Sequence, residues 1–445
     1  MSRYLICLVA FLNAFCALGQ EGFQLPEDVD KITIPFKRSN NLIIIPVKVN
    51  GTPLNFILDT GASHSIIFNL EKVDSINVQK GNKLKISGYG KRDPFEVYYS
   101  SKNQLECNGY YSNNANLFIM ANDNINLSGF LGVDIHGLMG YDFLSNFLVE
   151  LDYQKSVVNI HGGNSKIKRR LRRSTKIPIK IEKRKPYAIT VIENNDGRAN
   201  LNTLIDTGNG DAMWMLPPLE KSIIPKKGFP DFLGTGLSGK VKGMRSKVDQ
   251  LSLGKHQLNG VTVSLPELES LVNYSTDTNQ QLDFKGSVGG EVLSRFKVFL
   301  DYQNEMMYLK PRENLKKGFY YNMAGIELIE GDLQVFSTIE DVKLKEINDG
   351  YRNVSNDGSN LISKRKVITL APRIFINYVR PDSPAAIAGL KVGDEILKVN
   401  NTSQANLRID KLSSKFYSKP YSNIKFSVKR DVEIFKVKFQ LIPLI

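Results

Sequence analysis

Two aspartate residues stand in the same local pattern at distant places in the chain. Asp59 lies in "NFILDTGASHSII", residues 55–67, and Asp206 lies in "NTLIDTGNGDAMW", 147 positions later. Two carboxyl groups within hydrogen-bond distance hold a single proton, because like charges that close do not both ionise. The ionised member can take a proton from water while the protonated member polarises a carbonyl. The pattern therefore predicts amide hydrolysis without a metal or a covalent intermediate.

The residues after each aspartate suit a supporting role. Thr60 and Thr207 carry hydroxyl groups that can hydrogen-bond across an interface and stiffen the loop. Gly61 and Gly208 allow backbone conformations that a side chain would forbid. We expect both loops to be built in the same way.

Each aspartate follows a β-hairpin pattern. The segment "NLIIIPVKVNGTPLNFILDTG", residues 41–61, alternates apolar residues around a turn, and "YAITVIENNDGRANLNTLIDTG", residues 187–208, repeats this order. Such alternation indicates strands with one buried face. Each aspartate is thus predicted at the end of a buried strand.

A second repeat has nearly the same offset. Residues 138–154 read "LMGYDFLSNFLVELDYQ" and residues 287–303 read "SVGGEVLSRFKVFLDYQ", with nine of 17 positions identical at an offset of 149. Two patterns that recur in one order at almost one spacing indicate a duplicated unit.

The paired triplets, together with the apolar-apolar-Gly segments "LMG" and "SVG", resemble the aspartic peptidase family over residues 40–310, both its pepsin-like bilobal and its retropepsin-like members. The resemblance implies a mostly β fold with two barrel-like lobes, an interlobe cleft, and Asp59 with Asp206 as the catalytic dyad. It also implies a hairpin flap that carries a tyrosine. Tyr89 between two glycines is the candidate, and an ordinary glycine-rich turn is the alternative.

The second half departs from the family pattern at two positions. Asn209 replaces a small or hydroxyl residue, and we expect its amide to hydrogen-bond a carboxylate oxygen as a tuning of the second site. Ser287 stands where the family has an apolar residue.

The segment "INYVRPDSPAAIAGLKVGDEILKVNN", residues 376–401, resembles a PDZ domain. PDZ domains bind an extended peptide as an added strand and hold its C-terminal carboxylate on backbone N–H groups. The resemblance implies that "AGIELIEG" supplies this loop, and the candidate residues are Gly325, Ile326, Glu327 and Leu328.

The 445 residues are enough for several domains. Residues 1–19 read as a cleaved secretory signal, with an uncleaved membrane anchor as the alternative. The remaining ranges are an N-terminal lobe at 20–163, a basic linker at 164–176, a C-terminal lobe at 177–315, and a PDZ-like domain at 316–445 with an insertion near 341–373.

The composition limits which classes of partner and cofactor are expected. The net charge of +14 would suggest nucleic acid, but the basic residues gather in the linker without interleaved aromatic residues. Cys107 is the single cysteine after the signal, so no internal disulfide forms, and it is expected in the core. The four histidines show no metal-ligand spacing. We expect no metal, no cofactor and no nucleic-acid partner.

The sequence therefore predicts an exported aspartic endopeptidase, periplasmic, secreted or envelope-associated, that is monomeric because both lobes are present. The PDZ-like module would recruit protein or peptide substrates, with a C-terminal peptide as its expected ligand. The alternative is a catalytically inactive peptide-binding or scaffold protein of the same fold.

Overall fold

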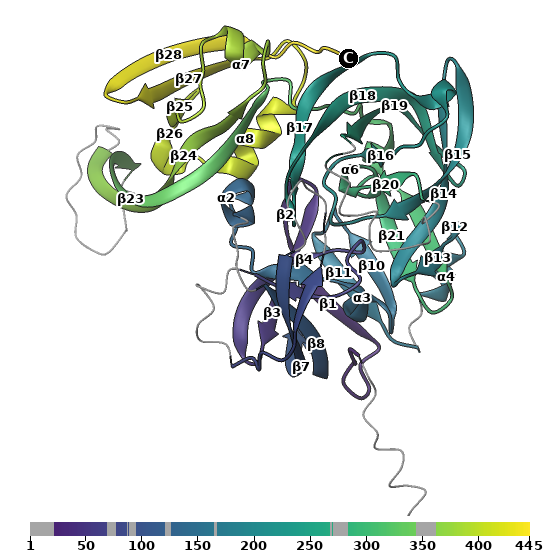
Figure 1. Cartoon of the computed structure of the whole chain (residues 1–445). Coiled ribbons are helices and arrows are strands. Elements are labelled where there is room, and N and C mark those ends of the chain that lie inside the picture. The colour runs from purple at the N-terminus through teal and green to yellow at the C-terminus, as the bar shows by residue number, and fades with distance from the viewer. Residues whose placement is uncertain are drawn as a thin grey trace, which may run out of the picture. The chain divides into compact units, whose positions relative to one another are not determined.

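The structure, a computed structural model, describes residues 22–68, 77–86, 88, 95–120, 126–163, 167–267, 269, 284–343 and 362–445. The chain forms two compact units (Figure 1). Unit 1 contains Met1–Leu127, Val133–Tyr320 and Leu444–Ile445, and unit 2 contains Ser128–Gly132 and Tyr321–Pro443. The expected signal at 1–19 and the flap candidate Tyr89 lie outside the described residues.

Unit 1 holds two eight-stranded sheets with the same spatial order. In the N-terminal lobe the order is β2 (Lys37–Ser39), β3 (Leu42–Val49), β4 (Thr52–Leu58), β9 (Gly137–Met139), β5 (Ile66–Ile67), β8 (Tyr110–Met120), β7 (Phe95–Cys107), β6 (Lys83–Ile86). In the C-terminal lobe it is β13 (Lys180–Glu182), β14 (Lys185–Asn194), β15 (Gly197–Ile205), β20 (Gly286–Val288), β16 (Met213–Met215), β19 (His256–Pro266), β18 (Gly239–Leu253), β17 (Gly228–Gly236). Each strand of one lobe has a counterpart in the other, so the sequence repeat is also a structural repeat.

A third sheet joins the lobes. Its order is β1 (Lys31–Pro35), β11 (Val157–His161), β10 (Leu148–Asp152), β21 (Phe296–Asp301), β22 (Met306–Pro311), β12 (Thr175–Pro178). The central pair, β10 and β21, comes from the two copies of the repeat, and Leu151 pairs with Val298 across the boundary. Apolar side chains of this sheet and of both lobes form one continuous core, whose burial stabilises the two lobes as one body.

Alternating residue types explain these strands. In β3 the side chains from Ile43 to Ile45 are buried, and beyond Pro46 apolar Val47 and Val49 face inward while Lys48 faces solvent. Such a strand has one face on the core and one in water.

Helices in unit 1 are short. In the described ranges they are α3 (Tyr141–Leu144), α4 (Lys168–Leu171), α6 (Gly290–Leu293) and the 3-10 turns η3 (Lys221–Ile223) and η5 (Glu313–Lys316), while α2 (Leu127–Leu131) belongs to unit 2 except for Leu127. Among the residues that the structure covers, none of the helices has the length and hydrophobicity needed to traverse a bilayer.

Unit 2 has a five-strand path of β23 (Ile326–Lys343), β24 (Ile362–Val379), β25 (Glu395–Val399), β27 (Asn423–Arg430) and β28 (Glu433–Gln440), with β26 (Thr402–Ser403) paired to β25. Its helices are α7 (Pro384–Ile387), η6 (Gln404–Asn406) and α8 (Ile409–Phe416). Ser383 caps α7 by accepting the Ala386 N–H at 3.2 Å. Residues 344–361 of the expected insertion lie outside the described part of the chain.

Candidate active site

The two aspartates lie at equivalent places in the two lobes. Asp59 follows β4 and its N–H donates to the Met139 carbonyl at 2.9 Å, while Asp206 follows β15 and donates in the same way to Val288. Both acceptors belong to the short parallel strands β9 and β20, which contain the apolar-apolar-Gly segments. Each segment therefore fixes the backbone of one aspartate.

The structure brings the two carboxyl groups together. The Asp59 and Asp206 carboxyl groups both border the space beside Gly61, and they are close enough to influence each other's pKa. A Cβ atom on Gly208 would lie 2.3 Å from the Asp59 carboxyl carbon, and one on Gly61 would lie 2.9 Å from Asp206 Oδ1. Only glycine fits at these two positions, because the carboxyl group of the opposite lobe fills the space where a side chain would lie.

Four reciprocal hydrogen bonds lock the loops together. Thr60 Oγ1 donates to the Ile205 carbonyl at 2.6 Å and accepts the Thr207 N–H at 2.9 Å. Thr207 Oγ1 donates to the Leu58 carbonyl at 2.7 Å and accepts the Thr60 N–H at 3.0 Å. Both threonines are fully buried, so these bonds are shielded from competing water and hold the two aspartates at a fixed separation.

Burial dominates the electrostatics of the pair. It raises the pKa of Asp59, against the hydrogen bond from the Gly61 N–H and the positive charge of Lys185. Burial and then the charge of Asp59 raise the pKa of Asp206 to about 8. The pair therefore retains one proton at neutral pH, which is the protonation state needed for paired acid and base chemistry.

Turns from each lobe dock on the aspartate loop of the other. The β13–β14 turn brings Arg184 to the first loop, where Nη2 donates to Asp142 Oδ1 at 2.8 Å and Nη1 lies 3.0 Å from His64 Nδ1. The β2–β3 turn brings Asn41 to the second loop, where Nδ2 donates to the Gly210 carbonyl at 2.9 Å. These contacts add to the interlobe sheet in fixing how the loops face each other.

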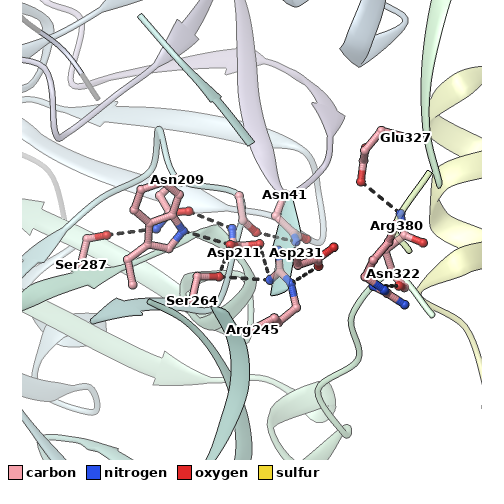
Figure 2. A network of polar contacts seen from close by, with 12 residues as sticks. Asn41, Asn209, Asp211, Asp231, Arg245, Ser264, Ser287, Asn322, Glu327 and Arg380 are labelled. Atoms are coloured by element: carbon pink, nitrogen blue, oxygen red, sulfur yellow. Dashed lines mark hydrogen bonds and ion pairs between the residues drawn. The ribbon is translucent and has the colours of Figure 1, made fainter. Parts of the chain in front are cut away.

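The two departures of the second half pair with one another (Figure 2). Asn209 Nδ2 donates to Ser287 Oγ at 3.0 Å, and Asn209 Oδ1 accepts the Asp211 N–H at 3.0 Å. The Asn209 amide therefore bonds within its own lobe, to Ser287 and to the Asp211 N–H. In the first half the corresponding residues are Ala62 and Leu138, so a polar pair replaces an apolar pair.

A buried ionic network lies next to the second loop (Figure 2). Asp211 accepts from Trp214 Nε1 at 2.9 Å, from Ser264 Oγ at 2.7 Å and from Arg245 Nη1 at 3.3 Å. Arg245 Nε donates to Asp231 Oδ2 at 2.8 Å. Sequence reasoning missed this network, because its members are distributed over 53 residues with no periodic spacing.

A second hairpin contacts the flap region. Gly88, next to the flap candidate, donates its N–H to Ser238 Oγ at 3.1 Å, and Ser238 lies in the turn between β17 and β18. In strand order β17 is the counterpart of β6, so each lobe contributes an equivalent hairpin. A sequence signal existed, since Gly90 and Lys91 align with Gly239 and Lys240 at the repeat offset of 149.

The PDZ-loop candidates lie in unit 2. Gly325 has a φ of +75°, and Ile326, Glu327 and Leu328 begin β23 and pair with β24.

Within the described ranges, no group of three His, Cys, Asp or Glu side chains could hold a metal ion. Cys107 is buried, and burial raises the pKa of its thiol.

Comparisons with known proteins agree with these assignments of domain type. Residues 45–143 match a family model described as aspartyl protease, and residues 375–430 match one described as PDZ domain. Among solved structures, the aspartic proteinase from Irpex lacteus is similar, with 11% identity and a TM-score of 0.40 over 64% of this chain and 99% of that chain. No curated protein matches.

The matched segments confirm the family resemblances and the fold class. The chain is mostly β, and it combines an aspartyl protease domain with a C-terminal PDZ domain. The family model for the protease matches residues 45–143, within the first lobe, and the second lobe has the same strand order.

Proposed function

We propose that this protein is an aspartic endopeptidase that hydrolyses peptide bonds through Asp59 and Asp206. The observation that supports this most directly is the juxtaposition of the two carboxyl groups around Gly61 and Gly208, on loops locked from both lobes by Thr60 and Thr207. An inactive scaffold would have no need for two ionisable groups whose burial costs free energy unless they are paired.

The reaction follows from the shared proton. The ionised carboxyl takes a proton from a water molecule, and the resulting hydroxide forms a bond to the scissile carbonyl carbon. The protonated carboxyl donates its proton to the carbonyl oxygen, which gives a neutral tetrahedral diol. The first carboxyl group then donates the proton it took from water to the amide nitrogen, while the second takes a proton from a diol hydroxyl; the carbonyl re-forms, the C–N bond breaks, and the dyad again holds one proton.

Asparagine substitutions test this proposal. Asp59→Asn and Asp206→Asn should each reduce cleavage of a fluorogenic peptide pool to background, because neither variant can both accept and donate the proton. Asp196→Asn is the matched control, since Asp196 lies in an exposed turn paired with Lys226. A statine-containing peptide, which mimics the tetrahedral diol, should inhibit the native protein. Full activity in either dyad variant would place the chemistry elsewhere.

The role proposed for unit 2 is the recruitment of protein substrates by peptide binding. Arg295 donates to the Leu315 and Gly318 carbonyls, and its guanidinium lies 3.4 Å from the centre of the Phe319 ring. Unit 1 therefore includes its chain through Tyr320, and a truncation should end there. The truncated protein should cleave short peptides at a near-native rate and lose efficiency mainly on protein substrates. Equal efficiency on every protein substrate would contradict recruitment.

Export is proposed from the sequence of residues 1–19 alone. Its test is N-terminal sequencing of the protein recovered outside the cytoplasm, where the mature chain should begin near Gln20. A chain that retains Met1 would contradict cleavage.

A further inference from the structure

The loop before β23 is already occupied by one of its own side chains (Figure 2). Asn322 Oδ1 accepts the Gly325 N–H at 3.0 Å, and Asn322 Nδ2 donates to the Ile326 carbonyl at 2.8 Å. Asn322 is 5% exposed, so this arrangement is shielded from water. In addition, the Met323 N–H donates to the Phe416 carbonyl at the end of α8 at 3.1 Å. Of the candidate loop residues, Gly325 thus already has an internal acceptor for its N–H.

The charges around the loop also disfavour a carboxylate. Asn322 Nδ2 lies 3.1 Å from Glu327 Oε1, so a negative charge stands beside the loop. The nearby cation, Arg380, is only 2% exposed and donates from Nη1 to the Asn322 carbonyl at 3.2 Å. An incoming carboxylate would therefore lie close to the Glu327 carboxylate, and the guanidinium is not accessible from solvent.

Beyond the loop, β23 offers a long edge with an apolar side. It is the edge strand of its sheet. Among the described residues of unit 2, β23 pairs only with β24. Val335 pairs with Leu370 and Ser337 with Ile368, so apolar side chains from both strands share a face. Leu333, Val335, Ile368 and Leu370 are each more than 60% exposed. We name these four residues the apolar strip.

We propose that unit 2 binds an interior, extended polypeptide segment, apolar at alternate positions, alongside β23 and its apolar strip, and that it does not select a free C-terminal carboxylate. An added strand forms main-chain hydrogen bonds along a sheet edge, and its alternate side chains extend the strip. The occupied Gly325 N–H and the neighbouring Glu327 carboxylate weaken the interaction that would favour a chain terminus. This inference rests on the peptide-binding role proposed for unit 2 and specifies its ligand.

The test compares two forms of one probe. The full chain with Asp59→Asn, which prevents cleavage, is titrated against a fluorescent twelve-residue peptide pool that alternates aliphatic and polar positions. One pool ends in a carboxylate and the other in an amide. We expect dissociation constants that agree within about twofold, because a terminal charge that finds no partner adds little affinity.

Variants in the same background make the test specific. Val335→Ser with Leu370→Ser should weaken binding of both pools about tenfold, while Val432→Ser, at a 90% exposed turn position of the same unit, should leave it unchanged. Asn322→Gly should favour the carboxylate pool, because it releases the Gly325 N–H. Glu327→Gln, which removes the negative charge beside the loop and disturbs folding less, should also favour the carboxylate pool.

Each outcome has a distinct meaning. Tighter binding of the carboxylate pool by at least about tenfold overturns the inference but leaves recruitment intact. No binding of either pool overturns the inference and the recruitment role together. Concentration-dependent self-association through the apolar strip, in place of peptide binding, would also overturn it. None of these results bears on hydrolysis by the dyad, which is measured separately with unsubstituted Asp59.

Discussion

Replacing Thr60 by valine tests whether the reciprocal threonine bonds hold the lobes together. Valine keeps the shape of threonine but removes the hydroxyl that bonds the Ile205 carbonyl and the Thr207 N–H. Both backbone groups are buried, and an unsatisfied buried group costs about 1–3 kcal/mol. The free energy of unfolding should therefore fall by about 2–6 kcal/mol.

Thr203→Val is the matched control. Thr203 is also fully buried, but its hydroxyl contacts the Ala188 carbonyl at 3.1 Å and Thr190 Oγ1 at 3.3 Å within one lobe, and no backbone N–H of the described residues donates to it. This substitution should cost about 1 kcal/mol, the net value of an ordinary hydrogen bond. Peptide cleavage should fall in the Thr60 variant and remain near native in the control, because Thr60 helps to fix the distance between the aspartates and Thr203 does not.

Urea unfolding followed by tryptophan fluorescence provides the assay. Trp214 is the one tryptophan of the chain and bonds to Asp211 beside the second loop, so its emission reports on the site directly. The midpoint should shift to lower urea at an unchanged slope. A Thr60 variant as stable as the Thr203 variant would refute the reasoning, since the interlobe bonds would then contribute no more than any buried hydroxyl.

Three further predictions concern protonation and the second site. The folded Asp206 keeps its proton to about pH 8, whereas an unfolded aspartate ionises near pH 4. The contribution of Asp206 to the free energy of unfolding is therefore largest below pH 4 and falls as the pH rises to 8. Asp206→Asn should flatten this dependence in thermal melts taken at each pH. For the same reason, loss of peptide cleavage on the alkaline side should follow a group that titrates near pH 8, and a limb near pH 5 would contradict the shared proton. Ser287→Leu should lower the free energy of unfolding by about 1–3 kcal/mol, because it leaves the Asn209 amide without its acceptor. The double variant Ser287→Leu with Asn209→Ala reproduces the pair Leu138 and Ala62 of the first lobe. It should recover part of that loss in urea melts.

A fifth prediction concerns the acid stability of the interlobe sheet. Burial opposes ionisation of Glu150, but hydrogen bonds with His161 at 2.8 Å and Lys297 at 3.0 Å outweigh it and lower the pKa of Glu150 to about 2. Because the folded pKa is depressed, this stabilisation is present above about pH 4.5 and is lost as pH falls towards 2. Glu150→Gln should cost about 3 kcal/mol at pH 7 and much less at pH 2. An equal cost at both pH values would show that charge is not involved.

Local patterns in the sequence were enough to predict much of the architecture. The duplicated Asp-Thr-Gly and apolar-apolar-Gly segments predicted two similar β lobes, because a repeat in one order at one spacing implies a repeated fold. The spacing within "SPAAIAGLKVGDEIL" predicted the PDZ domain, since turns, a capped helix and a strand are each specified by nearby residues. Apolar alternation placed both aspartates at strand ends.

Only the tertiary structure determined how polar side chains are paired. Asn209 finds Ser287 78 positions later, Ser238 accepts from Gly88 150 positions earlier, and Asn322 occupies the loop that the sequence assigned to a ligand. An amide or hydroxyl group can bond to many partners, and its own neighbours in sequence do not say which one folding brings within 3 Å. The types of residue at the site thus followed from the sequence, whereas the contacts that orient, occupy or restrict them followed from the packing of distant strands.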